Sequence, residues 1–140
     1  IQRGFYFETT FNLNESVVEL YVIFCVLFTI ARELIKDIED INGDLTIQSK
    51  TFPIVFGITP TKGLIALIFI SSSLLLSLGL IRTPFSISSF SFFIPSLVIT
   101  FVLLLSTLLA KETTSFQKLS KLIKLQFLFS TLWLYVNALL

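Results

Sequence analysis

The chain has 140 residues, of which 54% are hydrophobic and 14% charged, and its net charge is +1. Soluble domains average roughly 25% charged residues, so this balance and a mean hydropathy of +0.92 place the chain in the membrane class and predict no nucleic-acid partner. The absence of histidine excludes Ser-His-Asp catalysis, and the single cysteine, Cys25, excludes an internal disulfide and a thiolate metal cage, so we expect it to be inert packing.

Four apolar stretches approach the roughly 20 residues that a helix needs to cross a bilayer. They cover residues 16–35, 62–80, 89–110 and 119–140. Glu15 and Glu19 suit the positive end of the first helix dipole, and Pro95 should kink the third helix or mark its beginning. The sequence therefore predicts an all-α protein, a polytopic transmembrane bundle with four spans.

A polar stretch, residues 36–61, joins the first two spans. Asn42-Gly43 is a helix-stop signal, and Pro53 and Pro60 exclude one continuous helix. The distribution of the ten cations predicts the topology. Eight of them lie on one side of a four-span chain, and only Arg3 and Arg82 lie on the other side. The positive-inside rule then predicts a multi-pass protein of the cytoplasmic membrane, with this Asp-rich loop in the cytoplasm and both chain ends outside. The cations on the cytoplasmic side are Arg32, Lys36, Lys50, Lys62, Lys111, Lys118, Lys121 and Lys124.

The first two of these cations, Arg32 and Lys36, belong to a cluster of charges. Five carboxylates and two cations lie between Arg32 and Asp44. Asp37, Asp40 and Asp44 project from nearly the same face of a helix, or are brought together by a turn if the helix ends at Asn42-Gly43. Two such charges 4 Å apart repel by about 4 kcal/mol at an effective dielectric near 20. Mg²⁺, which is typically held by one or two carboxylates and by substrate phosphates, relieves this repulsion, so we predict a magnesium-bridged diphosphate site.

Other interpretations of the cluster differ in how well they fit. An EF-hand does not fit, because a glycine at its sixth position would put Ile38 at the first ligand position. Four lipid-length spans argue against a soluble isoprenoid synthase. A solvated juxtamembrane loop without function stays open. An Asp-lined ion pathway also stays open, although all three aspartates lie at one rim of the bundle. Lys118, Lys121 and Lys124 can anchor the topology or meet an anionic acceptor or lipid headgroups.

Two neighbouring blocks of residues carry a resemblance to a known family. Together they resemble the second Asp-rich motif of the UbiA superfamily of intramembrane prenyltransferases, and within it they are most similar to the geranylgeranylglyceryl-phosphate geranylgeranyltransferases. The DxxDxxxD spacing is a weak signal alone, but KTxPxxxG six residues later makes it specific. The blocks are Arg32-Glu33-x-x-Lys36-Asp37-Ile38-Glu39-Asp40-x-x-Gly43-Asp44 and Lys50-Thr51-Phe52-Pro53-Ile54-Val55-Phe56-Gly57.

The resemblance implies a nine-helix bundle in which this chain, as one domain part, supplies the four helices of the C-terminal half. Each half would place one Asp-rich motif at the cytoplasmic mouth of a lipid-open cavity. The first motif is missing here, and the chain begins at Ile1 without any methionine, so we expect an N-terminal half of the same fold as a partner. Asn42, Leu45 and Thr46 depart from the charged residues that the family leads one to expect.

The resemblance also implies roles for single residues. Asp37, Asp40 and Asp44 would be the catalytic carboxylates and the Mg²⁺ ligands, and Arg32, Lys36 and Lys50 would bind the diphosphate. The implied reaction transfers a geranylgeranyl group from geranylgeranyl diphosphate to a lipid-like prenylglyceryl phosphate, a step of ether-lipid and phospholipid biosynthesis among membrane lipids. Prenylation of an aromatic quinone precursor, and a non-catalytic membrane half or relic without the first motif, are the alternatives.

Overall fold

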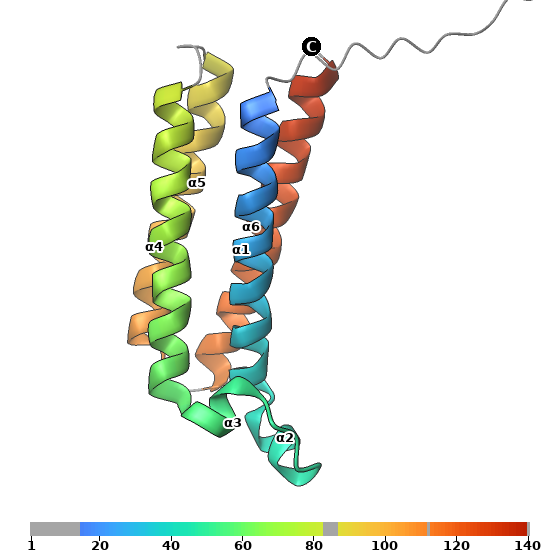
Figure 1. The fold of residues 1–140 in the computed structure, drawn as a ribbon, viewed down its shortest axis with the longest axis vertical. Coiled ribbons are helices and arrows are strands. Elements are labelled where there is room, and N and C mark those ends of the chain that lie inside the picture. The colour runs from blue at the N-terminus through green and yellow to red at the C-terminus, as the bar shows by residue number, and fades with distance from the viewer. Residues whose placement is uncertain (1–14, 83–86, 112, 140) are drawn as a thin grey trace, which may run out of the picture.

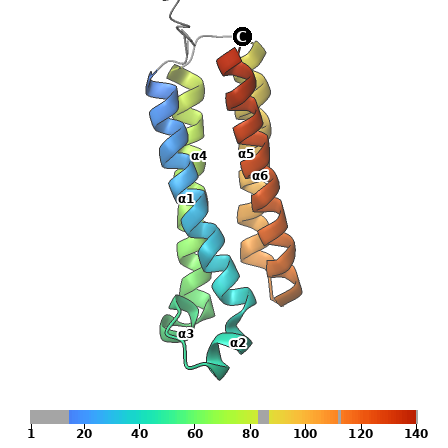
Figure 2. The same cartoon turned by 90° about the vertical axis from the view of Figure 1, so that its right-hand side faces the viewer.

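The computed structural model of the chain describes residues 15–82, 87–111 and 113–139, and within these ranges it contains helices and no strand. Four long helices form an antiparallel bundle in the cyclic order α1, α4, α5, α6 (Figures 1 and 2). Two short helices, α2 and α3, lie at one end, shown at the bottom of Figure 1. The predicted all-α class is confirmed. In chain order the helices are α1 (Glu15–Glu39), α2 (Ile41–Thr46), α3 (Phe52–Phe56), α4 (Ile58–Arg82), α5 (Ile87–Leu109) and α6 (Thr113–Leu139).

Two of the four long helices are long and apolar enough to cross a membrane. Within the described ranges these candidate spans, by length and composition, are Ile58–Ile81 of α4 and Ser91–Leu109 of α5. Charges shorten the apolar runs of the other two helices, because Glu19 and Arg32 bracket the run in α1 and Lys124 precedes the one in α6. The four-span topology therefore stays a prediction for α1 and α6.

Aromatic side chains fill the centre of the bundle. Phe28 of α1 is fully buried, and its ring centroid lies 5.5 Å from that of Phe69 of α4 and 6.0 Å from that of Phe127 of α6. Pairs of this kind contribute about 0.5–1.5 kcal/mol each beyond simple burial. They connect α1 to two neighbouring helices, α4 and α6.

The α4–α5 contact depends on small and polar residues. Gly79 is buried, and a Cβ atom there would lie only 2.7 Å from Cε1 of Phe93, so a larger residue would require the Phe93 ring to shift. The α4 serines bond to their own helix: Ser72, for example, donates to the carbonyl of Ile68 at 2.8 Å, and Ser71, Ser73 and Ser77 bond similarly. Small, internally bonded side chains let membrane helices approach closely.

One of the two roles predicted for Pro95 in the third long helix is wrong. Pro95 lies inside α5, which begins at Ile87, so the proline does not mark the beginning of the regular helix. Proline removes one backbone hydrogen bond, yet helices in a bundle tolerate it because neighbouring groups compensate for the loss.

The connection over residues 36–61 corrects a second prediction. The long helix α1 ends at Glu39, and Asn42-Gly43 lies inside α2 instead of stopping a helix. The stop comes at Gln48, whose φ of 54° is left-handed, with Ser49 N–H donating to the Asp44 carbonyl at 2.9 Å and Gln48 N–H to that of Leu45 at 3.3 Å. This is a Schellman motif, which satisfies the last carbonyls of α2.

The predicted effect of the two prolines is confirmed. Pro53 occupies the first turn of α3 and Pro60 the first turn of α4, positions where the missing N–H costs nothing. Gly57, with a φ of +94°, separates the two helices, and its carbonyl accepts a bond from Thr61 Oγ1 at 2.7 Å. The KTxPxxxG block therefore folds as a short helix and a sharp turn.

Candidate functional site

The predicted site residues gather at the end of the bundle that carries α2 and α3. Asp37 lies in the last turn of α1, Asp40 at the break between helices, and Asp44 in α2. Asp44 N–H bonds to the Asp40 carbonyl at 3.0 Å, and Asp40 N–H bonds to the Lys36 carbonyl at 2.9 Å, so the chain stays nearly helical across the break. Asp37 and Asp44 are half-buried, whereas Asp40 is exposed.

The carboxylates act on one another electrostatically. Burial raises the pKa of Asp37 above its usual range, and the negative charges of Asp44, Glu33 and Asp40 raise this pKa further, against a smaller opposing effect of Lys36. A carboxyl whose pKa is raised by its neighbours indicates a local surplus of negative charge. A bound cation would relieve this surplus.

The fit to a metal ion is partial. In the part of the chain that the structure describes, no three Asp, Glu or Cys side chains come close enough to form a metal-binding group. The three aspartates are therefore neighbours without converging on one point. Mg²⁺ needs only one or two protein carboxylates when phosphate oxygens or other ligands complete its shell, and hard carboxylate oxygens are the ligands that it prefers. The donor set present fits a Mg²⁺ ion that draws its remaining ligands from elsewhere.

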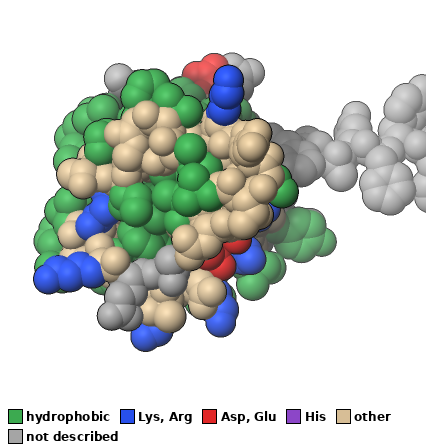
Figure 3. All heavy atoms as spheres, turned by 90° about the horizontal axis from the view of Figure 1, so that it is seen from below, with side chains coloured by type: hydrophobic (Ala, Val, Ile, Leu, Met, Phe, Trp, Pro, Cys, Tyr) green, Lys and Arg blue, Asp and Glu red, His purple; other side chains and the backbone are tan. Residues whose placement is uncertain are grey.

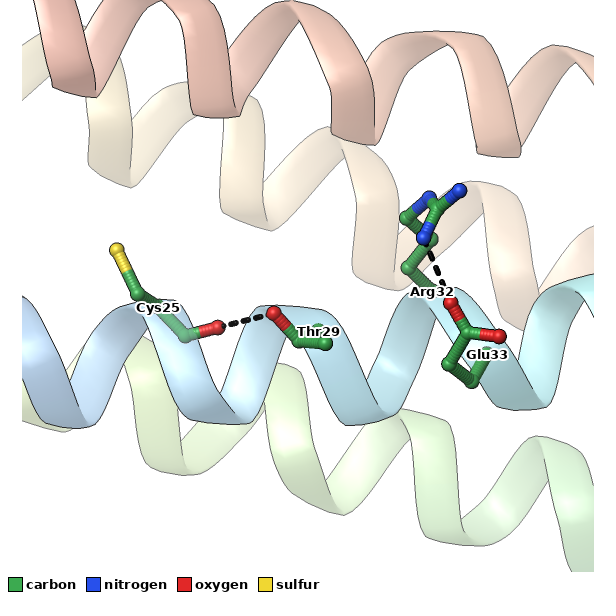
Figure 4. Close-up of polar contacts among 4 residues, drawn as sticks. All are labelled: Cys25, Thr29, Arg32 and Glu33. Atoms are coloured by element: carbon green, nitrogen blue, oxygen red, sulfur yellow. Dashed lines mark hydrogen bonds and ion pairs between the residues drawn. The ribbon is translucent and has the colours of Figure 1, made fainter.

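The predicted phosphate-binding cations differ in how they are engaged. Nη1 of Arg32 lies 2.6 Å from Oε1 of Glu33, as Figure 4 shows on α1. The two side chains are 34% and 53% exposed, so this pair contributes little stability and can open. Lys36 and Lys50 are exposed, and neither has an ion-pair partner among the described residues. Figure 4 also shows Thr29 donating to the Cys25 carbonyl at 2.8 Å, a bond within the helix that involves the backbone and not the thiol.

Two residues near this end have surroundings that the sequence did not predict. Thr51 is the N-cap residue of α3, but its Oγ1 is buried and has no partner among the described residues. Lys62 of α4 donates from Nζ to the carbonyls of Leu108 at 3.1 Å and Ala110 at 2.7 Å, at the end of α5. A cation suits the carboxyl end of a helix. The only sequence signal for Thr51 was its place in the KTxPxxxG block, and Lys62 had none.

Comparisons with known proteins agree on one kind of relative. The digeranylgeranylglyceryl phosphate synthase of Methanobrevibacter smithii is 46% identical over 50 residues, which are 34% of this chain and 18% of that protein. The digeranylgeranylglyceryl phosphate synthase of Methanosphaera stadtmanae is 32% identical over 101 residues, 72% of this chain and 36% of that protein. That of Haloquadratum walsbyi is 49% identical over 45 residues, 32% of this chain and 15% of that protein.

These matches confirm the resemblance that the two residue blocks predicted, and they are consistent with a UbiA-type relationship. Neither a family model nor a solved structure matches the chain. The matches span between 15% and 36% of the length of these relatives, so the resemblance covers a part of each.

Proposed function

Because this chain is similar to part of the digeranylgeranylglyceryl phosphate synthases, we propose that it is the C-terminal half of a membrane prenyltransferase. The complete protein transfers a geranylgeranyl group from its diphosphate to a prenylglyceryl phosphate, in ether-lipid biosynthesis. The observation that carries the proposal is the group of acidic and basic residues on α1, α2 and the following loop, placed at one end of a bundle that contains two lipid-length helices.

The charges of this end suit a diphosphate held together with a cation. Asp37, Asp40 and Asp44 supply carboxylates, and the crowding at Asp37 favours positive charge beside it. Lys36 and Lys50 are free of ion pairs among the described residues. Arg32 can exchange Glu33 for a phosphate, which a guanidinium binds through two parallel hydrogen bonds.

The reaction replaces the bond from C1 to the diphosphate oxygen by a bond from C1 to the acceptor oxygen, and it releases one proton. The C1–O bond of the prenyl diphosphate breaks, and the diphosphate leaves with the electron pair. The acceptor hydroxyl oxygen bonds to C1 and releases its proton to water, so the products are an ether, diphosphate and one proton. Arg32, Lys36 and Lys50 bind the oxygens on which negative charge develops, and Asp44 orients the acceptor. When bound, Mg²⁺ supplies further stabilisation of charge on the diphosphate.

The missing ligands are assigned to an N-terminal half of the same fold. No three acidic side chains of the described residues form a metal-binding group, and this supports a second acidic motif as the source of further ligands. This arrangement gives the two halves one shared site at the cytoplasmic face of the cell membrane.

Substitution of the aspartates tests the proposal. We expect Asp37→Asn and Asp40→Asn in the complete enzyme to lower kcat by about 10²–10³-fold, because each removes charge stabilisation at the diphosphate. The assay is transfer of labelled geranylgeranyl diphosphate in membranes, with Mg²⁺ present. Glu39→Gln is the matched control, since Glu39 lies in the same stretch and has no assigned role, and it should stay within a few-fold of the parent.

Folding and acceptor choice are checked in the same assay. Size-exclusion chromatography and circular dichroism show whether each variant keeps its fold. Near-normal rates of folded Asp37→Asn and Asp40→Asn would remove the carboxylates from the mechanism. Product formed with an aromatic acid and not with a prenylglyceryl phosphate would overturn the acceptor assignment while leaving the transferase.

A further inference from the structure

The charges of the second part of the chain are nearly all positive. From residue 58 onward the sequence has six cations and a single carboxylate, Glu112, which lies outside the described residues. Lys111, Lys118, Lys121 and Lys124 are exposed near the end of α5 and along the first turns of α6. Figure 3, which looks onto this end of the bundle, shows basic side chains at several places around its edge and acidic ones in smaller groups. The acidic cluster belongs to α1 and α2, so the lysines of α6 lie on a different helix from these carboxylates.

A groove of about 320 Å³ lies between α5 and α6 beside these lysines. Its floor is apolar and buried, formed by Ala110 and Leu119, and Leu109 and Leu122 form its walls. Three polar residues, Ser106, Ser115 and Lys118, belong to its lining. The groove therefore combines one cation and two hydroxyl groups with an apolar base.

Exposed leucines extend the groove along both helices. Leu105 lies one turn before Leu109 on α5, and Leu125 lies one turn after Leu122 on α6, so each shares a face with a groove residue. Leu105 and Leu125 are 43% and 59% exposed. A ligand with a phosphate at one end and a hydrocarbon chain at the other matches this sequence of polar and apolar surface.

We propose that the α5–α6 groove binds an anionic membrane phospholipid. Lys118 pairs with the lipid phosphate, the hydroxyls of Ser106 and Ser115 donate to its oxygens, and an acyl chain lies along the leucines. Lys62 does not take part, because its Nζ already donates to the carbonyls of Leu108 and Ala110. The site uses none of the residues assigned to the diphosphate, so it stands independently of the proposed enzymatic function.

Native mass spectrometry of the full chain tests this site with defined lipids. The protein is incubated with equal amounts of phosphatidylglycerol and phosphatidylcholine, and the two retained lipids are counted. We expect phosphatidylglycerol to be retained preferentially. Lys118→Gln should lower this preference about fivefold, the effect expected of one lysine at a lipid phosphate. Lys121→Gln, the matched control, removes the same charge from the same helix without lining the groove, and it should change the preference less than twofold.

A second variant separates a shaped site from diffuse surface charge. Ser106→Phe keeps every charge but fills the groove, and it should also lower the preference several-fold. Equal losses for Lys118→Gln and Lys121→Gln would overturn the proposal, and so would an unchanged preference in a folded Ser106→Phe. Millimolar inorganic phosphate should leave the lipid bound, and its displacement would make the site one for a free anion. Displacement by a prenylglyceryl phosphate at equal concentration would make it an acceptor site instead, which is a different claim.

Discussion

Single residues at the charged end of the bundle influence one another through space. Asp37 is half-buried and has three carboxylate neighbours, from its own helix, from the break at Asp40 and from α2. Glu33 is one of these neighbours, and it also holds the guanidinium of Arg32 at 2.6 Å. Glu33 therefore affects the proposed site in two ways, through the charge that it adds near Asp37 and through the cation that it occupies.

The pH dependence of metal binding checks this influence. Because the pKa of Asp37 is raised, this carboxyl takes up its proton at a higher pH than an ordinary aspartate, for which the pKa is about 3.9. Mg²⁺ needs the ionised form, so its affinity should fall as the pH drops through the raised pKa. Glu33→Gln removes one negative neighbour, and this lowers the pKa of Asp37. The loss of affinity should then move to lower pH.

Isothermal titration of the complete protein with Mg²⁺, at a series of pH values and with geranylgeranyl diphosphate present, measures this shift. Glu39→Gln serves as the control, because Glu39 is not among the groups that shift the pKa of Asp37. A pH profile that is unchanged in Glu33→Gln, or that moves to higher pH, would contradict the assignment.

Among the elements, the short helices show where local sequence signals succeed and where they fail. Pro53, Gly57 and Pro60 behave as their chemistry dictates, because a fixed φ and a left-handed φ are properties of single residues. Asn42-Gly43 does not stop a helix, since glycine is common at helix ends but not required there. The left-handed residue is Gln48 instead, at a position set by hydrogen bonds to the carbonyls of Asp44 and Leu45.

Substitution by alanine should have opposite effects on stability at two glycines, Gly57 and Gly63. Gly57→Ala should cost about 1–2 kcal/mol, because its φ of +94° is unfavourable for any residue with a Cβ atom. Space is not the cause, since that Cβ would lie 3.7 Å from Cδ of Pro60, an ordinary contact. Gly63→Ala should stabilise by about 0.5–1 kcal/mol, because Gly63 lies within α4 with nothing within 4 Å of its added Cβ.

Unfolding in mixed micelles, followed by circular dichroism as the denaturing detergent increases, gives both free energies of unfolding. Equal effects of the two substitutions would show that the turn at residue 57 is not strained in the way described.

In the whole molecule, the apolar pattern predicts the helices well and their contacts poorly. Residues 62–80 and 89–110 lie within one to four residues of the described ends of α4 and α5, because lipid-length runs of apolar residues have few alternatives to a helix. The site residues could be predicted as a group because they are close in sequence. The Lys62 contacts could not, since its carbonyl partners are 46 and 48 residues away. Local propensity contains no information on which helices become neighbours.

A buried amide in α6 offers a test of the four-helix packing. Gln126 is fully buried, and neither Nε2 nor Oε1 has a hydrogen-bond partner among the described residues. An unsatisfied buried polar group costs about 1–3 kcal/mol, so Gln126→Leu should raise the free energy of unfolding by roughly that amount. Gln117→Leu is the control, because Gln117 is exposed on the same helix and should change stability little. Destabilisation by Gln126→Leu would show that the amide is hydrogen-bonded in the complete protein.

The bonds of Lys62 to the end of α5 also impose an order on biosynthesis. Lys62 is synthesised long before Leu108 and Ala110, so its ammonium group lacks these two acceptors while the intervening hairpin is made. The start of α4 can bond to the end of α5 only when that end has been synthesised, and a nascent chain arrested before residue 108 would lack both hydrogen bonds of Lys62.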